Sequence, residues 1–364
     1  TTGDAAQVYG NMLVGDVVTT GANADVFGDV ESVNAANIGG GKSQVSPDVS
    51  KGLMGGDVTS GGVMTVGGAT GGVLPGPIIS GDLTSAGAST IGAYAKVFGN
   101  MLSGGIATTG ANSKVDGDVK GTAVVKSASS DIGGSEVTTT TAVSSTLKAV
   151  LEGKRDAAAI EVGAVRATLD SLGDTMGETT LAATMTVDTT LTADIYTAPS
   201  LSTTAFTTLT LDAEGNDNAE FIFNIGDILA IGAYHIIKVV NEGTLENTRV
   251  IWNVGGSATK DGGYASIGAQ ARFIGSVFAE DYVSLGAGAW ATTGGFNTCA
   301  GIYSETSFVS TGAKAVIDGN VCKTGLVVDI VDQVHVSEPF GLLLSGLAAL
   351  GFVTRRKTRA ARAS

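Results

Sequence analysis

The sequence has few of the residues that catalysis and metal binding require. Its 364 residues include 2 histidines and 2 cysteines. His235 and His335 have no glutamate or cysteine at ligand spacing, and Cys299 and Cys322 have no second cysteine pair. Neither a Gly-x-Ser-x-Gly element nor a phosphate-binding loop with lysine occurs. The sequence therefore predicts a protein that is not an enzyme and uses no cofactor or metal.

Basic and aromatic residues are also scarce. Lysine and arginine total 21 against 35 acidic residues, which gives a net charge of -14, and aromatic residues make up 5%. Nucleic acid is bound by clustered lysine and arginine, and bases stack on aromatic side chains, so a nucleic-acid partner is excluded. The hydrophobic fraction of 43% is enough for a sizeable core. This composition is typical of a secreted bacterial surface protein.

What the sequence has in abundance is glycine, with 54 residues, set between short segments rich in threonine and valine. Between Thr179 and Asn320, apolar residues alternate over four to seven positions, as in Phe221, Phe223 and Ile225, and a glycine then interrupts the pattern. Alternation of this kind predicts β-strands. Because the interruptions come too often for a sandwich of long strands, the pattern predicts a β-solenoid, in which each short strand ends at a corner.

The N-terminal part contains an internal repeat. Residues 7–30 and 96–119 align without a gap and share 15 of 24 residues. Val17, Val26 and Val30 stand where side chains of short strands would face inward, and the second copy has Ile106, Val115 and Val119 at the same places. A glycine-rich linker would not keep apolar residues at fixed offsets. We therefore interpret residues 1–80 as extra N-terminal solenoid coils that repeat the 96–119 unit, and residues 81–335 as the main solenoid domain.

Residues 144–172 follow a helical pattern instead. Apolar residues recur with a period near 3.6, and Ser144 or Ser145 can cap the first turn. The predicted buried face consists of Leu147, Val150, Leu151, Ile160, Ala164, Leu169 and Leu172. Charged residues such as Arg166 would mostly lie on the solvent side. We expect one long amphipathic helix lying along the side of the solenoid.

The order of these elements resembles the ice-binding-like protein family. The most specific segments are Ile195-Tyr196-Thr197, the run from Phe221 to Gly226, and the run from Ile251 to Thr259. The resemblance extends over roughly residues 80–320. It implies a mainly β protein, a right-handed discontinuous β-solenoid of triangular section with one long α-helix packed alongside.

The resemblance also implies an ice-binding surface. The loose motif of the family is threonine, then alanine or glycine, then any residue, then threonine or asparagine. Thr20 to Asn23 and Thr109 to Asn112 match it, whereas the segments beginning at Thr292 and Thr311 match in part. These residues are the expected contacts with the ice–water interface: Thr20, Asn23, Thr109, Asn112, Thr292 and Thr311.

An alternative function is structural. A solenoid can serve as an adhesin stalk or self-associate into a matrix filament, because its open ends present unpaired strand edges. Charged residues near the motifs, Asp25, Lys114 and Lys314, interrupt a regular ice face and favour this alternative.

The C-terminal tail, residues 336–364, resembles a PEP-CTERM sorting signal. Glu338 and Pro339 precede an apolar run from Phe340 to Val353, which we expect to form a short helix, and Arg355 and Arg356 follow. The resemblance implies processing by a sortase at the membrane of a Gram-negative bacterium. The protein is then secreted or held at the cell surface, and the alternative is a permanent membrane anchor. In that oxidising compartment Cys299 and Cys322 form either one disulfide or two buried thiols.

Overall fold

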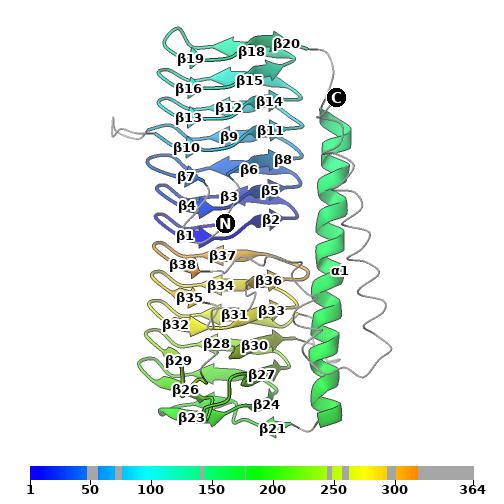
Figure 1. Cartoon of the computed structure of the whole chain (residues 1–364), viewed down its shortest axis with the longest axis vertical. Helices are drawn as coiled ribbons and strands as arrows, with labels where there is room; N and C mark the ends of the chain where they lie inside the picture. The colour runs from blue at the N-terminus through cyan, green and yellow to red at the C-terminus, as the bar shows by residue number, and fades with distance from the viewer. Residues whose placement is uncertain are drawn as a thin grey trace. The chain divides into compact units, whose positions relative to one another are not determined.

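The computed structural model describes residues 1–46, 56–69, 76–139, 143–176, 178–243, 248–255, 262–292 and 301–318. They lie within one compact unit, Thr1–Val321. This unit is a stack of coils in which every strand pair is parallel and each coil contributes one strand to each of three faces. The structure confirms the predicted solenoid with one helix packed alongside (Figure 1).

One sheet, sheet A, has thirteen strands and runs through the whole stack. Its strands in order are β19 (Asp131–Ile132), β16 (Lys114–Val115), β13 (Lys96–Val97), β10 (Ile78–Ile79), β7 (Gln44–Val45), β4 (Asp25–Phe27), β1 (Gln7–Tyr9), β38 (Val316–Asp318), β35 (Trp290–Thr292), β32 (Arg272–Ile274), β29 (Ile236–Val240), β26 (Thr208–Asp212) and β23 (Thr189–Thr192).

Two further sheets belong to the N-terminal coils. Sheet B comprises β2 (Met12–Val14), β5 (Val30–Ser32), β8 (Val58–Ser60), β11 (Leu83–Ser85), β14 (Met101–Ser103), β17 (Val119–Gly121) and β20 (Glu136–Thr138). Sheet C comprises β18 (Ala123–Lys126), β15 (Ile106–Thr109), β12 (Ser89–Ile91), β9 (Met64–Val66), β6 (Ala35–Ile38) and β3 (Val17–Thr19).

The other two sheets belong to the C-terminal coils. Sheet D comprises β21 (Thr179–Thr180), β24 (Asp194–Ala198), β27 (Glu220–Ile225), β30 (Arg249–Val254), β33 (Ser276–Ala279) and β36 (Ile302–Ser304). Sheet E comprises β22 (Thr184–Met185), β25 (Leu201–Thr203), β28 (Ile228–Ile231), β31 (Tyr264–Ile267), β34 (Val283–Leu285) and β37 (Val309–Thr311).

The solenoid is discontinuous in sequence. The N-terminal coils stack away from β1, the helix α1 (Ser144–Met176) returns along the side, and the C-terminal coils stack back until β38 pairs with β1 (Figure 1). Gln7 pairs with Val316 and Tyr9 with Asp318. Residues 1–3 also join sheets C and E, because Thr311 N donates to Thr1 O at 3.0 Å and Thr2 N donates to Thr19 O at 2.8 Å.

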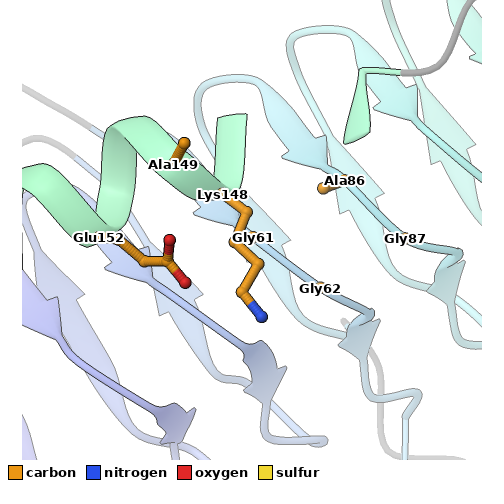
Figure 2. Close-up of a pocket in the computed structure, with 7 residues that line it drawn as sticks. All are labelled: Gly61, Gly62, Ala86, Gly87, Lys148, Ala149 and Glu152. Carbon is orange, nitrogen blue, oxygen red and sulfur yellow. The ribbon is translucent and has the colours of Figure 1, made fainter. Parts of the chain in front are cut away.

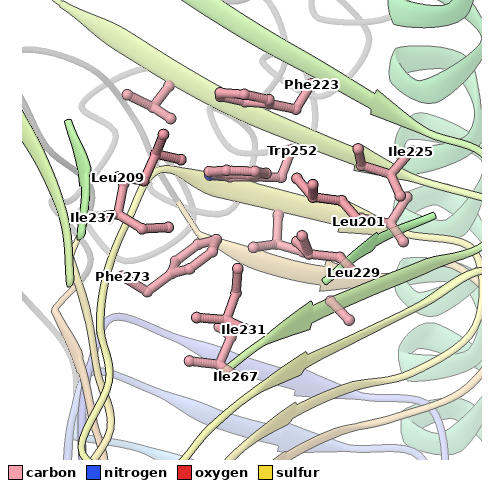
Figure 3. Close-up of a cluster of buried hydrophobic side chains, with 14 of the residues drawn as sticks. Leu201, Leu209, Phe223, Ile225, Leu229, Ile231, Ile237, Trp252, Ile267 and Phe273 are labelled. Carbon is pink, nitrogen blue, oxygen red and sulfur yellow. The ribbon is translucent and has the colours of Figure 1, made fainter. Parts of the chain in front are cut away.

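The two sets of coils have different cores. The core of the N-terminal coils is built of valine, isoleucine, leucine, methionine and alanine side chains. The core of the C-terminal coils also contains stacked aromatic rings (Figure 3). The Phe223 and Trp252 ring centroids are 3.9 Å apart, and Trp252 Nε1 donates to Ile274 O at 2.9 Å.

The repeat unit places its valines differently from the prediction at one position. Val26, Val30 and their counterparts Val115 and Val119 are buried, as expected. Val17 is 37% exposed because Val18, beside it on β3, takes the inward position.

The Gly-Asp pairs of the repeat form the corner between sheets A and B. Asp82 Oδ1 accepts a hydrogen bond from Asn100 N at 2.6 Å, and Asn100 Oδ1 accepts one from Asp118 N at 2.9 Å in the next coil. Each side chain thus caps a backbone N–H of its neighbour. The pKa of Asp57 in this row is raised by burial and further by the charges of Asp29 and Asp82.

The helix α1 is longer than the predicted 144–172 and is buried differently. Leu151, Leu169 and Leu172 are buried as expected, but Val150 and Ile160 are 51% and 74% exposed. The reason is that the helix contacts the solenoid along a narrow strip. Glycine permits this approach at Gly15, where a Cβ would lie 2.6 Å from Arg155 Cδ.

Polar groups hold the helix to sheet D. Asn224 Nδ2 donates to the Leu169 carbonyl at 3.0 Å, and Asn253 Nδ2 donates to Asp170 Oδ1 at 2.7 Å. Arg166, expected on the solvent side, is 6% exposed. Its guanidinium lies 2.5 Å from Glu305 Oε2 and 3.4 Å from Glu280 Oε2, so it ties α1 to the C-terminal coils.

We predict that Arg166→Ala lowers the free energy of unfolding by about 3 kcal/mol, because it leaves two carboxylates facing a buried site without their cation. Urea unfolding monitored by circular dichroism measures this. Arg155→Ala is the matched control, because the Arg155 side chain is 43% exposed and its loss should change stability by no more than about 0.5 kcal/mol. Equal effects of the two substitutions would contradict the conclusion that Arg166 ties α1 to the C-terminal coils.

Candidate functional site

The outer surface of sheet C carries side chains in a regular arrangement. Register places one outward side chain of each strand in a single column along the solenoid axis. That column consists of Thr19, Asn37, Thr65, Thr90, Thr108 and Val125. Neighbouring coils of a parallel stack are about 4.8 Å apart, so the side chains of the column recur at that interval. Thr65, Thr90 and Thr108 are three consecutive hydroxyl groups in it.

A second column of apolar side chains runs beside the first. It contains Val17, Ala35, Ile106 and Ala123 in register, with Val63 and Ala88 at the equivalent step before β9 and β12. Val17, Val63 and Ile106 are 37%, 54% and 47% exposed. We call the two columns from β3 to β15 the threonine face. No outward position on these five strands carries a charge.

The residues between these columns hold the threonine face rigid. Val18, Ala36, Met64 and Ala107 alternate with the outward residues and are at most 1% exposed. Threonine has restricted χ1 freedom in a strand because its Cβ is branched. The hydroxyl and methyl groups are therefore fixed in position by the core below them.

Sheet A is chemically unlike the threonine face. Its outward positions carry cations and anions, including Lys96, Lys114 and Asp116, and Lys114 Nζ lies 2.7 Å from Asp116 Oδ1. Burial raises the pKa of Asp25 on the same sheet, although side-chain hydrogen bonds from Gln7 and Gln44 oppose the rise. Such a surface organises water around individual charges.

Sheet E follows sheet C along the stack, but its outer surface is uneven. Its outward column holds Thr184, Ser202, Ala230, Ser266, Ser284 and Ser310. Beside it, Tyr264, Tyr282 and Phe308 form a ring stack with centroids 4.6 Å and 5.3 Å apart. Because an aromatic ring extends farther from the backbone than a serine hydroxyl, the stack forms a ridge.

Three of the four threonines predicted as ice contacts do not lie on an outer surface. Thr20, Thr109 and Thr311 are 4%, 2% and 8% exposed. Thr20 Oγ1 accepts a hydrogen bond from Gly39 N at 2.8 Å, and Thr109 Oγ1 lies 2.9 Å from Ser130 Oγ. These hydroxyls satisfy polar groups at a corner, so the expected placement does not hold.

The other predicted contacts occupy different places. Asn23 and Asn112 lie at the next corner with φ of 58° and 55°, a left-handed conformation that asparagine tolerates well. Asn23 Oδ1 accepts a hydrogen bond from Lys42 N at 2.9 Å. Thr292 lies on sheet A opposite Asp318. The structure therefore does not bring the six residues together on one surface, although Asn23 and Asn112 lie at the same exposed corner of different coils.

The sequence did contain a signal for the threonine face. In both repeat copies a second threonine, Thr19 or Thr108, stands directly before the motif threonine. Thr65 and Thr90 lie in the degenerate repeats and match no motif. Only the register between coils aligns them with Thr19.

Several predicted features lie outside the described residues: Cys299, Cys322, His335, Glu338, Pro339, Arg355, Arg356 and the apolar run 340–353. In the part of the chain that the structure describes, no helix has both the length and the apolar character to span a membrane. The same residues include no cluster of three or more histidine, cysteine or acidic side chains that could hold a metal ion.

A hollow of about 460 Å³ lies between α1 and the corners of sheets B and C (Figure 2). It is lined by Gly61, Gly62, Ala86, Gly87, Lys148, Ala149 and Glu152. Ligand pockets usually combine apolar walls with polar groups that converge from several elements. Here the polar side chains, Lys148 and Glu152, come from one helix, so the hollow is a packing seam.

Comparison with known proteins identifies the family. The sequence model of the ice-binding-like family matches residues 83–317. The chain belongs to this family. No curated protein matches it.

Three solved structures are similar to the chain, and the TM-scores are low. An ice-binding protein of Shewanella frigidimarina is 22% identical, with 65% of this chain and 95% of that chain covered and a TM-score of 0.37. One from the ascomycete Antarctomyces psychrotrophicus is 16% identical, with 67% and 93% covered and a TM-score of 0.34. One from an Antarctic Flavobacteriaceae bacterium is 14% identical, with 87% and 82% covered and a TM-score of 0.36.

The family match begins at the start of β11, so β1 to β10 precede it. These strands nevertheless lie in the middle of the stack, between β38 and β13 of sheet A. They contribute Thr19, Asn37 and Thr65 to the threonine face. The coils outside the family match therefore lengthen this surface.

Buried His235 gives the core a pH dependence. It is 1% exposed, its Nδ1 lies 2.8 Å from Thr207 Oγ1, and its Nε2 has no hydrogen-bond partner among the described residues. Burial lowers the pKa of His235. The folded state therefore binds this proton less tightly than the unfolded state does, and stability falls as the pH drops below about 6.5.

We predict that the fall in unfolding free energy between pH 7 and pH 5 is smaller in His235→Ala than in the parent protein. The register aligns His235 with Ala271, since Ile236 pairs with Arg272, so alanine is accommodated there. Urea unfolding at several pH values gives the slope of unfolding free energy against pH for each protein. Carboxylates contribute equally to both slopes, so their contribution cancels in the difference. Parallel slopes would show that His235 titrates normally.

Proposed function

We propose that this protein binds ice through the threonine face. Family membership supports ice as the partner. The observation that assigns the surface is the uncharged column Thr19, Asn37, Thr65, Thr90 and Thr108, held in register on five consecutive strands.

The chemistry of threonine suits an ice surface. A hydroxyl group both donates and accepts hydrogen bonds, so it can replace a water molecule in a lattice. The methyl group and the adjacent apolar column, with Val63 and Ile106, form no hydrogen bonds with water. Water molecules beside them therefore hydrogen-bond to one another. Ordered waters between protein and ligand are nearly as favourable as direct hydrogen bonds.

The absence of charge is equally important. An ammonium or carboxylate group orients its own hydration shell, which conflicts with a tetrahedral lattice. Across a chain with a net charge of -14, the threonine face is a neutral strip. Lys126, at the end of β18, is the first charged strand residue beyond it.

We predict that the double variant Thr65→Tyr, Thr90→Tyr loses nearly all thermal hysteresis and inhibition of ice recrystallisation, because two rings in the middle of the threonine face prevent flat contact. Gln44→Tyr, Ile78→Tyr is the matched control. It places the same rings in the same two coils but on sheet A.

The control variant should keep the activity of the parent protein. Equal loss in both variants would show that the rings act through stability, which melting curves check. Full activity of the Thr65, Thr90 variant would move the ice-binding surface elsewhere, with the outward column of sheet E as the next surface to substitute. A folded parent protein without activity would contradict ice binding itself.

We further propose that residues 336–364 direct the protein to the cell surface. The support is their order of Glu338-Pro339, apolar run and basic cluster. In a bacterium that processes such tails, the Glu338→Ala, Pro339→Ala variant should stay in the membrane fraction at full length while the parent protein is shortened and released. Identical fractionation of the two proteins would contradict processing at this site.

A further inference from the structure

The two ends of the stack differ in the charges that their last strands carry. One end is formed by β18, β19 and β20, and the other by β21, β22 and β23. Among the described residues, each of these strands is the last in its sheet and has a paired strand on one side. Both ends therefore present backbone N–H and C=O groups along an edge, which is the feature that invites another chain to add strands.

The first end carries charges at positions that belong to the core. In the coil below, Thr109 and Val119 face inward and are 2% and 0% exposed. Their partners in the last coil are Lys126 and Glu136. Lys126 Nζ lies 2.8 Å from Glu136 Oε1, so an ion pair crosses this end of the core. We call it the charged cap.

The charged cap opposes stacking of another molecule on this end. A further coil would remove both groups from water, and the loss of hydration of two ions is seldom repaid by their attraction. Inward-pointing charges on edge strands are a known means of preventing edge-to-edge association. At present the two side chains are 36% and 43% exposed and remain hydrated.

The other end has no such charges. Thr179 pairs with Tyr196, Met185 with Thr203, and Thr189 and Leu191 with Leu209 and Leu211, which defines its inward positions. None of the residues in β21, β22 and β23 is charged. At the adjacent corners Val187 and Phe206 are 67% and 75% exposed. In the described part of the chain, this end combines unpaired strand edges with uncharged strands and exposed apolar side chains at its corners.

We propose that the β21–β23 end binds the same end of a second copy and forms a two-fold dimer. The contact is isologous, so it closes after two copies. The charged cap at the far end of each copy stops growth into a filament. This inference is independent of ice binding, because the threonine face lies on the other set of coils.

Acidic residues lie beside these strands: Glu178 precedes β21, Asp188 precedes β23, and Asp194 begins β24. Asp188 Oδ1 accepts a hydrogen bond from Thr208 N at 2.8 Å, and Asp194 accepts hydrogen bonds from Ile195 N and Thr179 Oγ1. Salt screens the repulsion between these carboxylates and those of a second copy. The dimer should therefore strengthen as the salt concentration rises.

Analytical ultracentrifugation of the full chain over a range of concentrations tests the proposal. The parent protein should reach the mass of two chains. Thr189→Lys should stay a monomer at the same concentrations, because it introduces a charge at an inward edge position. Thr210→Lys is the matched control, since it adds the same charge to an outward position one coil inward, and it should dimerise like the parent protein.

Removal of the charged cap provides a second, opposite test. Lys126→Leu, Glu136→Leu should assemble beyond the dimer, because both ends are then uncharged. A parent protein that stays a monomer, or a folded Thr189→Lys variant that still dimerises, would overturn the proposed interface. A capless variant that stops at the dimer would overturn the role assigned to the charged cap.

Discussion

The pairing of β1 with β38 is the contact on which the rest of the structure depends. It joins strands more than 300 residues apart in the sequence and makes two separate stacks into one, with sheet A continuous across the join. Parallel pairing of this kind offers no local turn to guide it, so the closure entropy of a very long loop opposes it. The core on both sides and the helix α1 must compensate for that cost.

The helix contributes by connecting the two stacks on their side. Its buried contacts are concentrated near Leu151 and from Val162 to Leu172, with an exposed stretch around Ile160 between them. Lys154 reaches Glu31 in the N-terminal coils, and Arg166 reaches Glu280 and Glu305 in the C-terminal coils. The ion pair of Lys154 is exposed and weak, whereas that of Arg166 is buried. The helix is therefore fixed chiefly to the C-terminal coils.

The same stacking produces the threonine face and the two ends. The strand register aligns threonines from successive coils in one column on sheet C. It also leaves a last strand in every sheet, which requires either a charged cap or a partner. Thr65 and Lys126 both belong to sheet C. Thr65 lies in the middle of the stack and faces water, whereas Lys126 lies on the last strand and covers the end of the core.

The sequence by itself determined the fold class, the repeat, the existence of the long helix and the family. Short alternating segments separated by glycine allow few arrangements other than stacked coils. Only the tertiary structure decided which residues face outward. In Val17-Val18-Thr19-Thr20 every side chain is β-branched, so local pattern cannot tell inward from outward, and the motif favoured Thr20 over Thr19. The packing of Val18 in the core and the hydrogen bond from Gly39 N to Thr20 Oγ1 fix that choice. Arg166 illustrates the same limit, because its carboxylate partners lie more than 100 residues away.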